Sequence, residues 1–134
     1  MLASSLTALR LTLHILAATV WVGGQLTLAG LVPTLRDAGE GVVTAAAKAF
    51  SRLAWPAYVV LILTGLWNYT TFNLNDVSVA WKIVLAVKIT VALFAGLSTF
   101  LHQRAKSRGQ VAFWGSVSGI SAIAALTLGV FLAG

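Results

Sequence analysis

The sequence predicts an all-α integral membrane protein that folds as an antiparallel four-helix bundle in up-down-up-down order. Hydrophobic residues make up 59% of its 134 residues and charged residues only 9%. Its mean hydropathy is +0.93. A soluble domain carries about a quarter charged residues. Four long apolar stretches follow one another along the chain, and together they are expected to form a single transmembrane domain over residues 1–134.

The four apolar stretches predict helices over about residues 6–32, 50–69, 79–101 and 111–134. Each stretch has roughly 20 residues or more, which is enough to cross a hydrocarbon core of about 30 Å. The first stretch is too long for a signal-peptide core of about 7–15 residues, and Arg10 falls inside it. We therefore expect a retained helix, which Pro33 is predicted to end.

Basic residues are distributed unevenly between the connections. The first and third connections of a four-helix hairpin stack lie on the same side of the membrane. Six basic residues flank these two connections: Arg36, Lys48, Arg52, Arg104, Lys106 and Arg108. Because positively charged connections stay in the cytoplasm, the sequence predicts a multi-pass protein of the cell (inner) membrane with both termini outside.

Composition also excludes several classes of function. The chain has no cysteine, which excludes disulfides, thiolate metal sites and cysteine nucleophiles. Its net charge of +6 comes from nine basic and three acidic residues. So few basic residues in a very apolar chain are typical of topology signals and not of a nucleic-acid surface. The expected partners are the lipid bilayer and either a second copy or a larger membrane complex, with no nucleic acid.

Two ionisable residues, His14 and Lys88, lie deep inside predicted spans. Such groups are costly in a bilayer unless they face a partner, a cavity or a cofactor. Both helices start on the outer side, and both residues lie about 12–14 Å below that surface. This equal depth favours a shared site. The alternatives are a buried His14 bonded to a backbone carbonyl or to a hydroxyl such as that of Thr64, and a Lys88 that extends to the outer interface.

Residues at helical spacing from His14 extend the candidate site. Trp21 lies on the same face, with Gly24 beside it, and small residues there allow close packing or make room for a planar cofactor. Arg10 precedes His14 by one turn. It is expected to be either an interfacial anchor or the partner of an anion such as a propionate group.

His102 shares a helix face with Lys88 but lies about 21 Å further along the helix axis. His14 and His102 therefore cannot bind the same metal ion or haem within one subunit. Because His102 opens the basic third connection, it is expected at the membrane interface near lipid phosphates, with Arg104, Lys106 and Arg108 in contact with anionic lipids.

The segment from Leu13 to Gly24, with the pattern His-x6-Trp-x-Gly-Gly, resembles the first-helix signature of the copper-resistance protein D (CopD) family. The run Phe50-Ser-Arg-Leu-Ala and the later Leu63-Thr-Gly-Leu are similar to the next helix of that family. Trp81-Lys-Ile-Val-Leu-Ala-Val-Lys88 resembles its third helix, so that the likeness covers about residues 10–104. The HemJ-type protoporphyrinogen oxidases share a first-helix histidine and a third-helix lysine, which correspond to His14 and Lys88.

These resemblances imply a haem b or copper function. The first hypothesis is a haem-b-binding protein for electron transfer, or for metal and haem metabolism. In it His14 is the axial metal ligand, Trp21 and Gly24 line the haem plane, and Arg10 or Lys88 binds propionates. The alternatives are a HemJ-like oxidase, a copper permease component and an accessory subunit of a membrane complex, so enzymatic activity stays open. Soft copper ligands are scarce, because the chain has one methionine and no cysteine.

Overall fold

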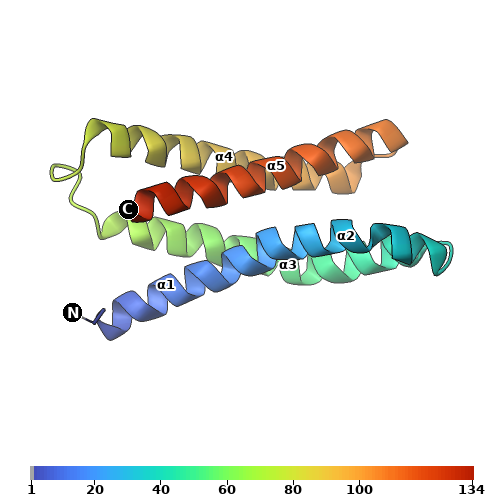
Figure 1. Cartoon of the computed structure of the whole chain (residues 1–134), viewed down its shortest axis with the longest axis horizontal. Helices are drawn as coiled ribbons and strands as arrows, with labels where there is room; N and C mark the ends of the chain where they lie inside the picture. Colours follow the sequence, from blue (N-terminus) through green and yellow to red (C-terminus); the bar gives the residue numbers. More distant parts are fainter. Residues whose placement is uncertain (1) are drawn as a thin grey trace. The chain divides into compact units, whose positions relative to one another are not determined.

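The computed structural model describes residues 2–134, and its regular structure over that range is helical (Figure 1). It contains four helical spans that are long and apolar enough to cross a membrane: Ser5–Asp37, Val42–Thr70, Val79–Arg104 and Arg108–Ala133. The predicted all-α membrane class is therefore confirmed. The chain divides into two compact units, Met1–Phe72 and Asn73–Gly134. The assembly of all four helices into one bundle stays a prediction.

Large apolar side chains on the outside of the helices support the membrane assignment. Leu16, Leu63, Ile120 and Phe131 are each more than half exposed. A soluble protein would pay a large hydration cost for such a surface, whereas lipid tails accept it.

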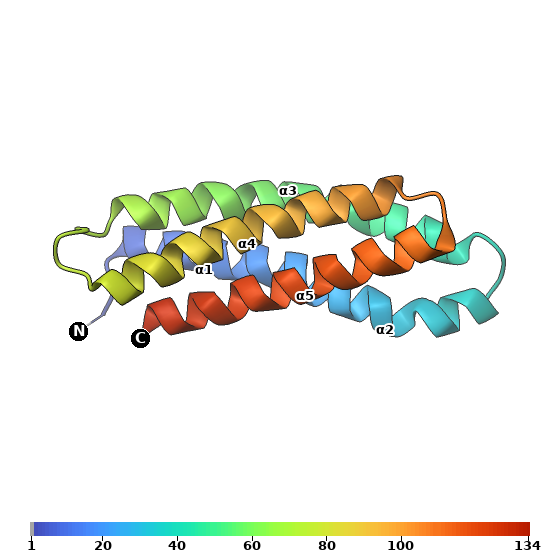
Figure 2. The same cartoon turned by 90° about the horizontal axis from the view of Figure 1, so that it is seen from above.

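The first unit is an antiparallel helical hairpin, and its first span is an unusually long helix of 33 residues. The span consists of α1 (Ser5–Ala18), a π-helical turn η1 (Thr19–Gly23) and α2 (Gly24–Asp37), which follow one another without a break (Figure 2). Ser4 caps its start by accepting a hydrogen bond from the Thr7 backbone N–H. The helix continues beyond the predicted end, because Pro33 lies inside α2. A proline removes one backbone hydrogen bond, a loss that membrane helices tolerate.

The second helix of this hairpin, α3 (Val42–Thr70), begins eight residues before the predicted start at Phe50. The expected connection over residues 33–49 shrinks to residues 38–41. Gly39 and Gly41 adopt positive φ angles of 143° and 78° there, which favours glycine. Charged residues end the apolar pattern, but the alanine-rich segment that carries Lys48 is a good helix former. Lys48 and Arg52 therefore lie on α3.

The second unit is the hairpin of α4 (Val79–Arg104) and α5 (Arg108–Ala133). Ser78 and Ser107 cap the two helices by accepting hydrogen bonds from backbone N–H groups. Both helices reach three residues further into the connection than the apolar pattern predicts. The buried residues of the two helices are small: Ala95, Gly96, Ser98, Thr99, Ser118, Ser121 and Ala122. Their size allows close helix packing, as is typical inside membranes.

Candidate functional site

His14 lies on α1 and points its Nδ1 atom at α3. Nδ1 is 2.8 Å from Oγ1 of Thr64. The Thr64 hydroxyl donates its own hydrogen to the carbonyl of Val60 at 2.6 Å. The hydroxyl therefore accepts from His14, which places the imidazole proton on Nδ1 and the ring lone pair on Nε2.

The bond to Thr64 is the structural alternative that the sequence suggested for a buried His14. It does not compete with a ligand role. Histidines that bind metals usually donate a hydrogen bond from the N–H of their second ring nitrogen to a fixed acceptor. This bond orients the ring and sets the tautomer. Next to this pair, a Cβ at Gly65 would lie 3.5 Å from Cε1 of His14, which is ordinary contact distance. The imidazole is therefore held against α3 by its Nδ1 edge.

Arg10 lies one turn closer than His14 to the N-terminus of α1, and it is only 9% exposed. Its guanidinium donates a hydrogen bond to the hydroxyl of Thr71, just beyond the end of α3. The Thr71 hydroxyl in turn donates to the carbonyl of Asn68 at 2.7 Å. A neutral hydroxyl does not balance a buried charge. An anion close to Arg10 would therefore lower the free-energy cost of burying its guanidinium.

Asn68 adds an unusual feature to the same end of α3. Its Oδ1 atom is buried without a hydrogen-bond partner within residues 2–134. Asn68 follows Thr64 by four residues, which places the two side chains on one face of α3, and Thr71 lies three residues further on, just beyond the end of the helix. The polar groups of Arg10, His14, Thr64, Asn68 and Thr71 thus gather at the end of the first hairpin where α1 begins and α3 ends.

Trp21 is 2% exposed and belongs to an aromatic cluster with two side chains of α3. Its ring centre lies 4.5 Å from that of Tyr58 and 5.6 Å from that of Trp55. Trp55 and Tyr58 also meet edge to face, at 5.8 Å. The π-helical turn Thr19–Gly23 carries Trp21 into this cluster. Trp21 therefore packs the two helices together two turns below His14.

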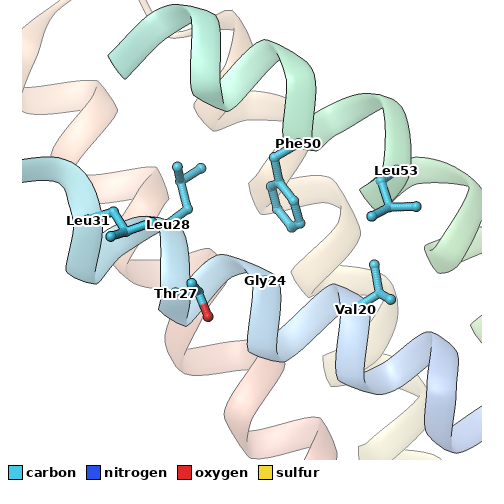
Figure 3. Close-up of a pocket in the computed structure, with 7 residues that line it drawn as sticks. All are labelled: Val20, Gly24, Thr27, Leu28, Leu31, Phe50 and Leu53. Atoms are coloured by element: carbon cyan, nitrogen blue, oxygen red, sulfur yellow. The ribbon is translucent and has the colours of Figure 1, made fainter. Parts of the chain in front are cut away.

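Gly24 lies directly under the ring of Phe50. A Cβ at this position would be 2.3 Å from a ring carbon, so the position requires glycine as long as the ring stays in place. Gly24 also lines an apolar groove of about 330 Å³ between α2 and α3, shown in Figure 3. The groove is lined by Val20, Gly24, Thr27, Leu28, Leu31, Phe50 and Leu53. The only hydroxyl, that of Thr27, donates to the Gly23 carbonyl at 2.8 Å.

Lys88 belongs to the second unit, where it is half-buried on α4. Its ammonium lies against α5 at Gly129, where a Cβ would come within 3.0 Å of Nζ. Lys88 follows Val79, the first residue of its helix, by nine positions, and His14 follows Ser5 by the same number. The two residues thus occupy equivalent places in their hairpins, while the predicted shared site stays a prediction.

His102 lies near the opposite end of α4. Its Nδ1 is 2.8 Å from the carbonyl oxygen of Val111 on α5. A Cβ at Gly115 would come within 3.1 Å of the imidazole. His102 therefore links the two helices next to their connection. Its expected place at the membrane interface stays a prediction.

Three features of these sites are not predicted from the sequence: Thr71 as the partner of Arg10, Gly129 beside Lys88, and the π-helical turn before Gly24. Across residues 2–134, no group of three or more His, Cys, Asp or Glu side chains could hold a metal ion. Comparison of the chain with protein-family models, with curated proteins and with solved structures gives no match.

Proposed function

We propose that this chain is a CopD-like integral membrane protein that binds haem b through His14. The observation that carries the proposal is the contact of 2.8 Å between Nδ1 of His14 and Oγ1 of Thr64. Since Nδ1–H is bonded to Thr64, the lone pair lies on Nε2, which is the usual ligand atom of an axial histidine.

The residues around His14 suit a haem better than a bare copper ion. A porphyrin would supply four nitrogen ligands of its own, so that His14 would suffice as the protein's ligand to the iron. A copper ion needs several protein ligands, and the chain has two histidines, one methionine and no cysteine. The buried guanidinium of Arg10 suits a propionate carboxylate one turn from the ligand.

The remaining candidate residues take supporting roles in this proposal. Lys88, which lies as many residues from the start of α4 as His14 does from the start of α1, supplies a positive charge and binds a second carboxylate. Trp21 and Gly24 hold α1 and α2 close to α3 and thereby fix the position of His14. The haem supplies one-electron redox chemistry when bound, and the protein serves electron transfer or haem metabolism.

Absorbance of the purified protein tests the haem proposal. The full chain, reconstituted with haem b, is expected to show a Soret band that shifts on reduction by dithionite. Thr64→Val removes the acceptor of the Nδ1 proton at constant shape, and we expect it to weaken haem affinity by about 10–100-fold.

The matched control is Thr99→Val, which removes a buried hydroxyl from the second hairpin, where Thr99 contacts Ser118 at 2.6 Å. It is expected to leave haem affinity unchanged. Equal losses in the two variants would show that Thr64 acts through general packing, and a wild-type chain without a Soret band would refute haem binding.

We also propose that both termini lie outside, with the connections at residues 38–41 and 105–107 in the cytoplasm. The chain has no cysteine, so each introduced cysteine reports a single position. In intact cells, a membrane-impermeant thiol reagent is expected to label Ser78→Cys and to spare Ser107→Cys until the cells are opened. The opposite pattern would invert the topology and move His14 to the cytoplasmic half of the membrane.

A further inference from the structure

We propose that the α4–α5 connection binds the headgroup of an anionic phospholipid that carries a free hydroxyl, as phosphatidylglycerol does. In this proposal Nε2 of His102 accepts a hydrogen bond from the headgroup hydroxyl, and Lys106 and Arg108 bind the phosphate. The proposal is independent of haem binding at His14.

The acceptor role of His102 follows from its contact with Val111. A carbonyl oxygen only accepts hydrogen bonds, so Nδ1 of His102 must carry the proton that it shares with Val111 at 2.8 Å. In the neutral ring, Nε2 is then an acceptor. Nε2 has no hydrogen-bond partner among residues 2–134. A ligand at this atom must therefore offer a donor, which a bare phosphate diester lacks and a glycerol headgroup has.

The position of His102 along α4 matches the depth of lipid headgroups. The helix has 26 residues and is about 39 Å long, which exceeds a hydrocarbon core of about 30 Å. Its last turn, which carries His102, therefore extends into the headgroup region. Gly115 leaves room for the ring on α5, since a Cβ there would come within 3.1 Å of the imidazole.

Two of the three cations near the connection are placed to reach the phosphate. Arg108 precedes Val111 by one helical turn and lies on a neighbouring part of the same face, and Lys106 lies in the connection itself. Both are exposed. Arg104 is held elsewhere, because its guanidinium carbon lies 4.6 Å from the ring centre of Phe100. Arg104 therefore provides a matched control for the loss of one positive charge.

The test compares two anionic lipids that differ in the headgroup hydroxyl: phosphatidylglycerol and phosphatidylmethanol with the same acyl chains. Binding to the purified full chain is measured by native mass spectrometry. We expect wild type to bind phosphatidylglycerol about fivefold more tightly, which is the effect of one hydrogen bond. Lys106→Gln and Arg108→Gln are expected to weaken the binding of both lipids to the same degree. Arg104→Gln is expected to weaken it much less.

Two variants of His102 remove the headgroup contact, one with and one without a donor for the contact with α5. His102→Asn keeps an N–H donor near the position of Nδ1 and removes Nε2, whereas His102→Phe removes both nitrogens and keeps a ring beside Gly115. Both are expected to lose the preference for phosphatidylglycerol. A preference that persists in His102→Asn, or none in wild type, would overturn the proposal. Displacement of the lipid by millimolar glycerol phosphate would show that the site recognises a soluble phosphate and would overturn it too.

Discussion

Replacement of His14 by alanine is expected to abolish haem b binding, with loss of the Soret band from the reconstituted protein. The reason is that the contact of His14 Nδ1 with Thr64 orients the ring and leaves Nε2 as the ligand atom. Thr64 holds Nδ1 at 2.8 Å, and alanine removes both nitrogens at once. The measurement is titration of the full chain with haem b, followed by absorbance and by reduction.

His102→Ala is the matched control, since it removes the same side chain from the second hairpin, next to the α4–α5 connection. It is expected to leave the Soret band and its titration intact. Free imidazole adds a second readout, because it can enter the space that His14→Ala leaves and restore part of the band. If both substitutions strip the haem equally, or if His14→Ala binds as wild type does, His14 is not the sole axial ligand.

The membrane class and the four spans could be predicted from hydropathy, but the ends of the helices could not. In a bilayer every backbone polar group needs a partner, so long apolar segments must become helices. Charges such as Lys48 end an apolar pattern at the membrane surface, while the backbone continues as a helix into the headgroup region. Pro33 likewise interrupts the pattern of hydrogen bonds without ending α2.

The candidate residues could be predicted one by one because ionisable side chains are rare in an apolar chain. Thr64 was among the expected partners of His14, since a buried imidazole needs a bond. The partner of Arg10 could not be predicted in the same way. Which residues of α3 face α1 depends on the register of the hairpin, and the register is set by the four-residue connection at residues 38–41 and by the π-helical turn at Thr19–Gly23. Neither has a pattern that hydropathy reveals.

Lys88→Met is expected to preserve folding while it lowers haem affinity or turnover by tenfold or more. Methionine nearly matches the length of lysine, so the contact with Gly129, where a Cβ would come within 3.0 Å of Nζ, is kept without the charge. A charge-assisted contact contributes about 1.5–3 kcal/mol, and about 1.4 kcal/mol corresponds to a tenfold change in affinity.

Loss of the positive charge at Lys88 also has a signature that a packing defect does not produce. A cation near the haem favours the reduced iron, so Lys88→Met is expected to lower the reduction potential of any haem that remains bound. Lys82→Met is the matched control, because Lys82 is exposed on the same helix, six residues nearer to its first residue. It is expected to change neither affinity nor potential. If Lys88 only extends to the outer interface, Lys88→Met will behave as Lys82→Met does. Wild-type haem content, potential and activity in Lys88→Met would refute the shared site and leave His14 to act with Arg10 alone.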